Sequence, residues 1–273
     1  MTAALSSKVK SKALLEQQDG DLLRLTLNDP KRANALSPAL VEALTAVYSR
    51  DLRSEGVRAV ILAAAGKHFS AGADLENLKS VAEKGLEENR EDSAKLRRLF
   101  ESIVRQEALT IALVHGACVA GGCGLATASD FVIAADEARF MYSEVRIGFV
   151  AALVASYLSL RLRGSDIREL LLNPEFIESG PALEIGLVNR LVPERELRTA
   201  GDELAAEVLS KASSESIART KRILLEVLGR PLPERLDLAA EANAQSRLTD
   251  DCRQGVEAFL KSKKSPNWRP IQS

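Results

Sequence analysis

The sequence predicts an α/β fold with a helical C-terminal part. Over the first half of the chain, segments with the alternation of a strand take turns with segments that have the period of a helix. Helical patterns dominate the last third, and no low-complexity linker interrupts the chain. We therefore expect one functional unit, with a core over 16–192 and a helical region over 193–273.

The composition narrows the class of protein. A chain of 273 residues can bury a sizeable core, and 46% hydrophobic with 27% charged residues is ordinary for a globular protein. A net charge of −1 gives no reason to expect binding to nucleic acid or to a membrane surface. Three cysteines do not make a disulfide framework, and we see neither a secretory signal nor a run of about 18 apolar residues. We expect a cytoplasmic protein.

The first elements have clear signals. Leu23, Leu25 and Leu27 alternate with polar neighbours, which predicts a half-buried strand. Ser37 can then cap a helix with Pro38 in its first turn. The apolar residues that follow at helical spacing are Leu40, Val41, Leu44, Val47 and Tyr48.

Later elements follow the same alternation. The segments that we expect to be strands are "RAVILAAAG", "LTIALVHG", "DFVIAAD" and "ARFMYSE". The segments that we expect to be helices are "SAKLRRLFESIVRQ", "AALVASYLSLRLR", "SDIRELLL", "RELRTAGDELAAEVLSKA", "SIARTKRILLEVL" and the stretch after Pro233. The charged region 76–92 is loosely patterned, and we expect a solvated helix-loop there.

Two segments rich in small residues each follow an expected strand. These are "HFSAGADLENL" and "HGACVAGGCGLATASD", and the latter holds Gly121, Gly122 and Gly124. Such turns expose backbone N–H groups, and a helix that starts at the second turn would add positive potential. Two N–H groups that converge on one point can stabilise a carbonyl oxygen as it gains negative charge. In "MYSEVRIGFV", Glu144 is a carboxylate with apolar neighbours that could move protons beside that carbonyl.

These segments carry a resemblance to a known family. "NDPKRANALS", "FSAGADL", "GACVAGGCGLATASDFVIAADEARF" and "SEVRIGF" resemble, in the family's order, the signature segments of the crotonase superfamily, in its enoyl-CoA hydratase/isomerase branch. The similarity extends to "GVEAFLKSKKSPNW" near the C-terminus. It implies a spiral of repeated ββα units with a helical C-terminal trimerisation region. It also implies a homotrimer, or a hexamer built as a dimer of trimers.

The resemblance implies roles for individual residues. The backbone amides of Ala73 and Gly121 would form the oxyanion hole for the thioester oxygen, and Glu144 would be the acid/base. The resemblance also implies an acyl-CoA substrate, with no separate cofactor and no metal. The residues expected to contact the substrate or its coenzyme A are Lys31, Arg32, Ala33, Ala71, Asp74, Leu75 and Gly122.

One departure from the family pattern leaves the reaction open. Familiar hydratases hold water with two glutamates, and the position of the first is Gly124 here. We expect an enoyl-CoA hydratase that adds water in the syn sense with Glu144 alone. The alternatives are a Δ3-Δ2 enoyl-CoA isomerase and a non-catalytic acyl-CoA-binding protein. Glu101 and Asp74 are conceivable helpers near Gly124, but nothing in the sequence places them there.

Plainer interpretations compete with these roles. The glycines of the second segment could serve tight packing of a helix on a strand, and Glu144 could be a salt-bridged carboxylate with Arg146 as its partner. Cys118 and Cys123 are expected to be buried structural thiols, because no second pair of metal ligands accompanies them.

Overall fold

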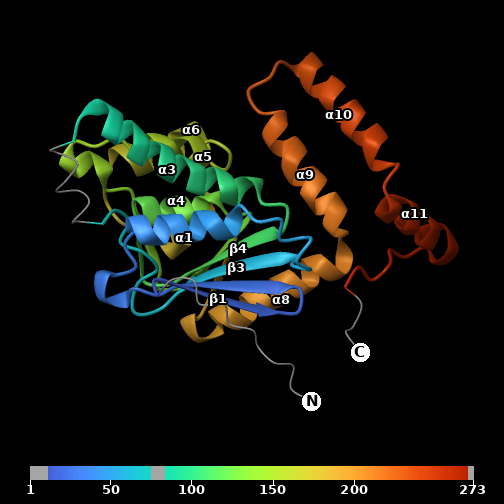
Figure 1. The fold of residues 1–273 in the computed structure, drawn as a ribbon, viewed down its shortest axis with the longest axis horizontal. Coiled ribbons are helices and arrows are strands. Elements are labelled where there is room, and N and C mark those ends of the chain that lie inside the picture. Colours follow the sequence, from blue (N-terminus) through green and yellow to red (C-terminus); the bar gives the residue numbers. More distant parts are fainter. Residues whose placement is uncertain (1–11, 75–83, 270–273) are drawn as a thin grey trace.

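A computed structural model describes residues 12–74 and 84–269 and has a mixed α/β architecture (Figure 1). Its strands are β1 (Leu14–Asp19), β2 (Leu22–Leu27), β3 (Ala59–Ala64), β4 (Leu109–Val114), β5 (Ala117–Val119), β6 (Phe131–Ala135), β7 (Arg139–Met141), β8 (Ile177–Glu178) and β9 (Arg190–Val192). Its α-helices are α1 (Pro38–Tyr48), α3 (Leu86–Arg105), α4 (Gly121–Ala128), α5 (Ala152–Leu158), α6 (Gly164–Leu172), α7 (Ser179–Glu184), α8 (Leu197–Lys211), α9 (Ser214–Glu226), α10 (Leu232–Ser246) and α11 (Asp250–Ser262). The 3₁₀ turns are η1 (Pro30–Arg32), η2 (Glu144–Ile147) and η3 (Glu194–Glu196).

A six-stranded sheet forms the centre of the molecule, in the order β1-β2-β3-β4-β6-β9. Only β1 and β2 pair antiparallel, and every later pair in this sheet is parallel. Parallel strands covered on both faces read as continuous apolar runs, and all six residues of β4 are buried. This explains why "LTIALV" shows no polar alternation.

A second ladder runs beside the first and stacks the segments that matter for function. The small sheet has the order β5-β7-β8. Isolated parallel bridges extend it, joining Ser70 to Cys118 and Leu36 to Ala73. Each turn of the chain therefore adds one strand to the large sheet and one short extended piece to the ladder, which is the repeating pattern expected of a crotonase spiral.

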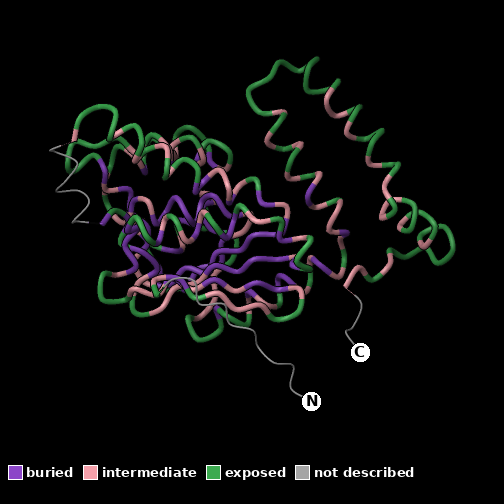
Figure 2. Tube along the Cα trace, in the orientation of Figure 1, coloured by how far each residue is buried: buried purple, intermediate pink, exposed green. Residues whose placement is uncertain are grey.

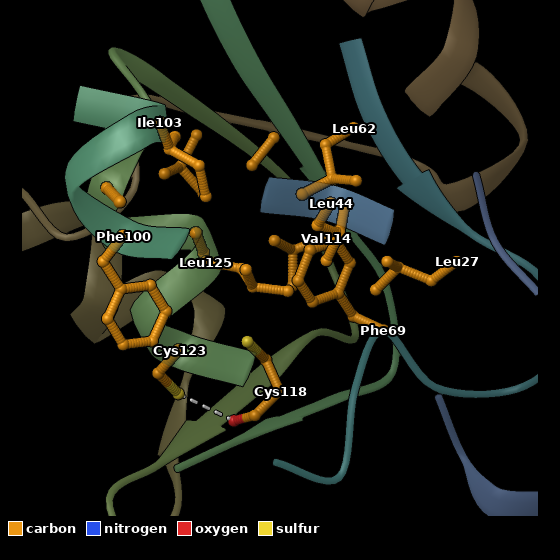
Figure 3. Packing of buried hydrophobic residues seen from close by; sticks show 14 of the residues in the cluster. Leu27, Leu44, Leu62, Phe69, Phe100, Ile103, Val114, Cys118, Cys123 and Leu125 are labelled. Atoms are coloured by element: carbon orange, nitrogen blue, oxygen red, sulfur yellow. Dashed lines mark hydrogen bonds between the residues drawn. The ribbon is translucent and has the colours of Figure 1, made fainter. Parts of the chain in front are cut away.

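Helices cover both faces of the large sheet (Figure 1). The larger hydrophobic cluster joins the sheet to α1, α3 and α4, and includes Leu44, Phe100 and Leu125 (Figure 3). On the opposite face α8 packs Leu204 and Leu209 in a second cluster with residues of the central strands. The core is thus a sheet between two helical layers, and it holds the ends of the short ladder strands rigidly.

The C-terminal helices stand away from this body (Figures 1 and 2). α10 and α11 have no buried residues, whereas α9 is anchored by the ammonium of Lys221, 2.6 Å from the carboxylate of Asp130. Arg58 donates to the carbonyl oxygens of Leu209 and Trp268 at 3.0 and 2.7 Å, which ties the last described residues back to the core. The domain boundary at 192/193 stays a prediction.

Most elements lie where the sequence predicted them, including the Ser37 cap, whose Oγ accepts from the Leu40 amide at 3.3 Å. Two element boundaries were wrong, and one strand was missed. α3 already begins at Leu86, so the charged stretch before residue 93 is helical from there on, while 75–83 lie outside the described residues. α5 ends at Leu158, earlier than its apolar pattern suggested, and β1 was not predicted at all.

Candidate functional site

The site lies at one end of three neighbouring extended segments, which are the segment of Ser70, β5 and β7. Ser70 bridges Cys118, and Cys118 pairs with Phe140 in the β5–β7 register. Following the chain three or four residues past each of these positions leads to Ala73, Gly121 and Glu144. Parallel strands end at the same edge, so this topology gathers all three predicted catalytic residues at one place.

The amide of Ala73 faces away from the protein segment that pairs with it. The carbonyl oxygen of Gly72 accepts a hydrogen bond of 2.7 Å from the Leu36 amide. Because a trans peptide points its C=O and N–H in opposite directions, the Ala73 N–H is directed to the side away from Leu36. Ala73 is exposed, so this N–H is accessible to a ligand.

The amide of Gly121 is the first of α4. The first N–H groups of a helix have no partner within it, and the helix dipole adds positive potential at this end. An ideal Cβ built on Gly72 would lie 3.1 Å from the Gly121 nitrogen, so the peptide before Ala73 and the start of α4 are in direct contact. Two N–H donors from adjacent segments therefore stand at one edge.

The glycines of this region serve protein packing. An ideal Cβ built on Gly121 would lie 2.8 Å from a methyl carbon of Leu36. One built on Gly122 would lie 2.7 Å from the Cβ of Ser70. On Gly72, which also has a φ of +79°, it would lie 2.5 Å from the Val119 carbonyl oxygen. The packing interpretation and the ligand interpretation are thus compatible: the missing side chains let the two donor segments approach one another.

Glu144 is a buried carboxylate at the start of η2, with 9% of its surface exposed. Its Oε2 is buried and accepts no hydrogen bond within the described structure. Burial raises the pKa of this carboxyl above its usual value, and a hydrogen bond from its own backbone opposes the shift. A group with these properties is suited to take up and return a proton.

Arg146 does not neutralise Glu144. Its guanidinium lies 3.0 Å from the carboxylate of Glu175, and both side chains are exposed. The interpretation of Glu144 as half of a salt bridge with Arg146 was therefore wrong.

Gly124 is covered by an aromatic ring. An ideal Cβ at Gly124 would lie 2.5, 2.9 and 3.1 Å from three ring carbons of Phe100 on α3. Figure 3 shows Phe100 reaching from α3 toward the helix that carries Cys123. Sequence reasoning missed Phe100, because only its position within the apolar stripe of a helix marked it.

The two carboxylates considered as helpers have other partners. Glu101 lies 2.9 Å from the guanidinium of Arg105, one turn along α3. Asp74 is buried and lies 2.8 Å from the guanidinium of Arg32. Among the residues that the structure describes, the three atoms nearest to a Cβ at Gly124 all belong to Phe100, and neither carboxylate lies as close.

The residues predicted to hold coenzyme A lie on two joined segments. Lys31 and Arg32 are exposed on η1, and the carbonyl oxygen of Ala33 accepts from the Ala71 amide at 2.8 Å. Between them lies Asn34, the last residue of the Lys31–Asn34 segment that the resemblance places at coenzyme A. Its side chain accepts from the Asp29 amide and donates to two carbonyl oxygens, and it is fully buried. Leu75 lies outside the described residues.

The cysteines of the second segment are buried thiols, as predicted. The Sγ of Cys123 donates to the carbonyl oxygen of Cys118 at 3.0 Å (Figure 3). Burial holds the pKa of the Cys118 thiol well above its usual value, which makes it a poor nucleophile.

Two backbone amides and a buried carboxylate that stand at the same edge can polarise a carbonyl and move a proton on the neighbouring carbons. None of the helices within 12–74 and 84–269 combines the length and the apolar character needed to cross a bilayer.

Comparisons with known proteins find enoyl-CoA hydratases among the relatives of this chain. A protein of Thermus thermophilus named "Putative enoyl-CoA hydratase" is 41% identical over 251 residues, which cover 92% of this chain and 98% of the relative. A crotonyl-CoA hydratase of Syntrophomonas wolfei is 31% identical, over 92% of this chain and 96% of its own. The crystal structure of a Mycobacterium smegmatis enoyl-CoA hydratase superposes with a TM-score of 0.87 at 31% identity, over 94% of this chain and 99% of that one.

The model of the enoyl-CoA hydratase/isomerase family matches residues 17–270. The chain belongs to this family, and it is an enzyme of the crotonase superfamily.

Proposed function

We propose that this enzyme reversibly adds water to 2-enoyl-CoA thioesters, with Glu144 as its single acid/base. The observation that carries the proposal is the buried Oε2 of Glu144, which has no hydrogen-bond partner within the described structure and lies at the same edge as the Ala73 and Gly121 amides. An unpartnered buried oxygen is costly for the free protein, and it is satisfied once a water or substrate group donates to it.

The proposed reaction uses these groups in two steps. Glu144 removes a proton from a water molecule as that water's oxygen bonds to C3, and the C2–C3 π electrons move onto the thioester oxygen. The amides of Ala73 and Gly121 hydrogen-bond the enolate oxygen that results; one such donor typically contributes about 3–4 kcal/mol. The protonated Glu144 then returns its proton to C2, which completes a syn addition and restores the carboxylate.

The binding segment fits an acyl-CoA. Lys31 and Arg32 present cationic side chains on an exposed turn, where the phosphates of coenzyme A would be attracted. Ala71 and Ala73 expose backbone beside that turn. We further propose a cytoplasmic homotrimer or dimer of trimers, with the exposed apolar residues of α10 and α11 at subunit contacts; among them are Leu236, Phe259 and Leu260.

One observation favours a second candidate reaction. Among the described residues the ring of Phe100 lies nearest to Gly124, so Glu144 is the base that this part of the structure offers, and one base suffices to carry a proton from C2 to C4 of a 3-enoyl-CoA. A peroxisomal dienoyl-CoA isomerase of Arabidopsis thaliana is 30% identical over 90% of this chain. The alternative is therefore a Δ3-Δ2 enoyl-CoA isomerase.

Absorbance at the enoyl-thioester band separates the two. Crotonyl-CoA and a 3-enoyl-CoA are given in parallel to the wild type and to Glu144→Ala. If the wild type removes the band of crotonyl-CoA and Glu144→Ala does not, the hydratase is supported. Appearance of the band from the 3-enoyl-CoA, with crotonyl-CoA unchanged, would replace the hydratase with the isomerase. Inactivity on both substrates would reject both reactions.

A further inference from the structure

The ring of Phe100 fills the space between two helices that leave the site. On one side it lies against Gly124 of α4, at the distances given above, and on the other it meets Tyr157 of α5 edge to face, with ring centroids 5.8 Å apart and planes at 75°. Phe100 is fully buried, whereas Tyr157 is half-buried. The two rings form a plug with Phe100 on the inside.

The plug stands one helical turn beyond the oxyanion-hole amide. Gly121 and Gly124 are three positions apart on α4, so they are neighbours on the helix surface, separated by roughly 4.5 Å along its axis. α5 begins shortly after the turn that carries Glu144. An acyl chain that leaves a carbonyl held at Gly121 and runs along α4 would therefore meet the Phe100 ring about one helical turn further on.

We propose that Phe100 is a specificity-determining residue that limits the enzyme to short-chain acyl groups of about the size of crotonyl. This inference rests on the proposed acyl-CoA function, and it holds for hydration and for isomerisation alike, since both fix the thioester at the same amides.

The surroundings of Phe100 keep the ring in place. Interiors are close-packed, and a ring without exposed surface swings only if its neighbours move. Gly124 has no side chain that could move aside, and the ring of Tyr157 packs edge to face with Phe100. Truncation of Phe100 would open a pocket lined by Gly124 and closed at its far end by Tyr157, into which a longer chain can extend.

The test compares kcat/KM for crotonyl-, 2-hexenoyl- and 2-octenoyl-CoA in the wild type, Phe100→Ala and Phe100→Leu. The wild type should prefer crotonyl- over 2-octenoyl-CoA by at least about tenfold, since pocket discrimination of this order is typical for apolar groups. Phe100→Ala should reduce that ratio by about tenfold or more, and Phe100→Leu by less. Ile103→Ala is the matched control: Ile103 is fully buried one turn along α3, and its truncation should leave the ratio unchanged.

A second readout does not depend on the reaction. Dissociation constants of the saturated butyryl-CoA and octanoyl-CoA, measured by calorimetry, should show the same preference and the same change on Phe100→Ala. A wild type that binds butyryl-CoA more tightly than octanoyl-CoA but fails to hydrate crotonyl-CoA would support the role of Phe100 and reject the hydratase. The proposal is overturned if the wild type uses short and long chains equally well. It is also overturned if Phe100→Leu and Phe100→Ala both leave the ratio of kcat/KM for crotonyl-CoA to that for 2-octenoyl-CoA unchanged.

Discussion

The amide of Ala120 donates a hydrogen bond of 2.8 Å to the carbonyl oxygen of Met141. This bond joins the segment that leads into Gly121 to the strand that leads into Glu144. Ala120 reaches it with φ 48° and ψ −119°, a backbone conformation that L-residues with a Cβ rarely adopt. The orientation of the Gly121 amide is thus held by a strained residue directly before it.

Ala120→Gly should relieve that strain. A residue in such a conformation costs about 1–3 kcal/mol, which glycine would recover. The greater flexibility of glycine in the unfolded chain costs about 0.5–1 kcal/mol, so we expect a net stabilisation of about 1 kcal/mol. Since the Gly121 amide would be less firmly oriented, kcat should fall severalfold while acyl-CoA binding changes little. Urea denaturation and steady-state kinetics measure both. Ala126→Gly, within the helix that follows Ala120, should only destabilise the protein. A similar loss of stability from Ala120→Gly would contradict the strain.

Replacing Glu144 by Gln should remove the acid/base and leave the shape of the site. We expect kcat to fall by about 10²–10⁴, with dissociation constants for a saturated acyl-CoA within about threefold of the wild type. Because burial raises the pKa of Glu144, the wild-type kcat/KM should fall on the acid side at a pH above the ordinary glutamate value of about 4.3. The exposed Glu175→Gln is the control and should change neither quantity. Substantial turnover by Glu144→Gln would reassign the base.

The same substitution has a pH-dependent effect on stability. A carboxyl whose pKa is raised by folding favours the folded state while it is protonated, and this contribution is lost as the pH rises through the folded-state value. Glu144→Gln resembles the protonated form at every pH. Its thermal midpoint should therefore exceed that of the wild type near pH 7, and the two should converge below about pH 4. Midpoints that differ by the same amount at both pH values would argue against a raised pKa.

Filling the space of Gly124 should destabilise the protein. A Cβ there meets the ring of Phe100 at 2.5 Å, and overpacking of this kind costs about 1–3 kcal/mol. Combining Gly124→Ala with Phe100→Leu should recover part of the loss, because residues in contact show coupling energies of about 0.5–3 kcal/mol. Gly180→Ala, where a Cβ meets nothing within 4 Å, should be neutral or stabilising. Strict additivity of Gly124→Ala and Phe100→Leu would refute the contact.

Sequence patterns predicted much of this fold because they reflect interactions between residues that are close in the sequence. The apolar run of β4 and the Ser37 cap are short-range features, and both lie where expected. β1 escaped prediction because only Leu14 in it is fully buried, which leaves little alternation to detect. The early start of α3 escaped prediction because its first turns are polar. They are stabilised by acidic residues in the first turn and by the carboxylate of Glu88, which accepts a hydrogen bond of 2.9 Å from the Gly85 amide.

The site required long-range information that no short segment contains. Motif order indicated Ala73, Gly121 and Glu144, yet the direction of the Ala73 amide depends on a bond to Leu36. The pairing of Arg146 with Glu175 instead of Glu144 could not be read from sequence distance, since the partner lies 29 residues away. Phe100 and Gly124 are likewise brought together only when α3 packs on α4.

The last prediction concerns Asn34, which lies in the predicted coenzyme A segment. Asn34 has a φ of +53°, and its side-chain oxygen accepts from the Asp29 amide at 2.8 Å while its nitrogen donates to the carbonyl oxygens of Ala65 and His68 at 2.8 and 2.9 Å. Asn34→Ala leaves those three backbone groups without their partner, and each buried unsatisfied group costs about 1–3 kcal/mol. We expect a loss of about 3 kcal/mol or more in the free energy of unfolding.

A functional effect should accompany that loss. Asn34 joins η1 to the segment with Ala71 and Ala73, so its removal should raise KM for acyl-CoA more than it lowers kcat, because the chemistry at Glu144 is untouched. Asn173→Ala removes only an exposed side-chain bond to Glu169 and should stay within about 0.5 kcal/mol of the wild type. Chemical denaturation and steady-state kinetics below the unfolding transition measure both effects. If Asn34→Ala were as stable as Asn173→Ala, the three bonds would not hold this segment, and the position of the Ala73 amide would have to depend on the Leu36 bond alone.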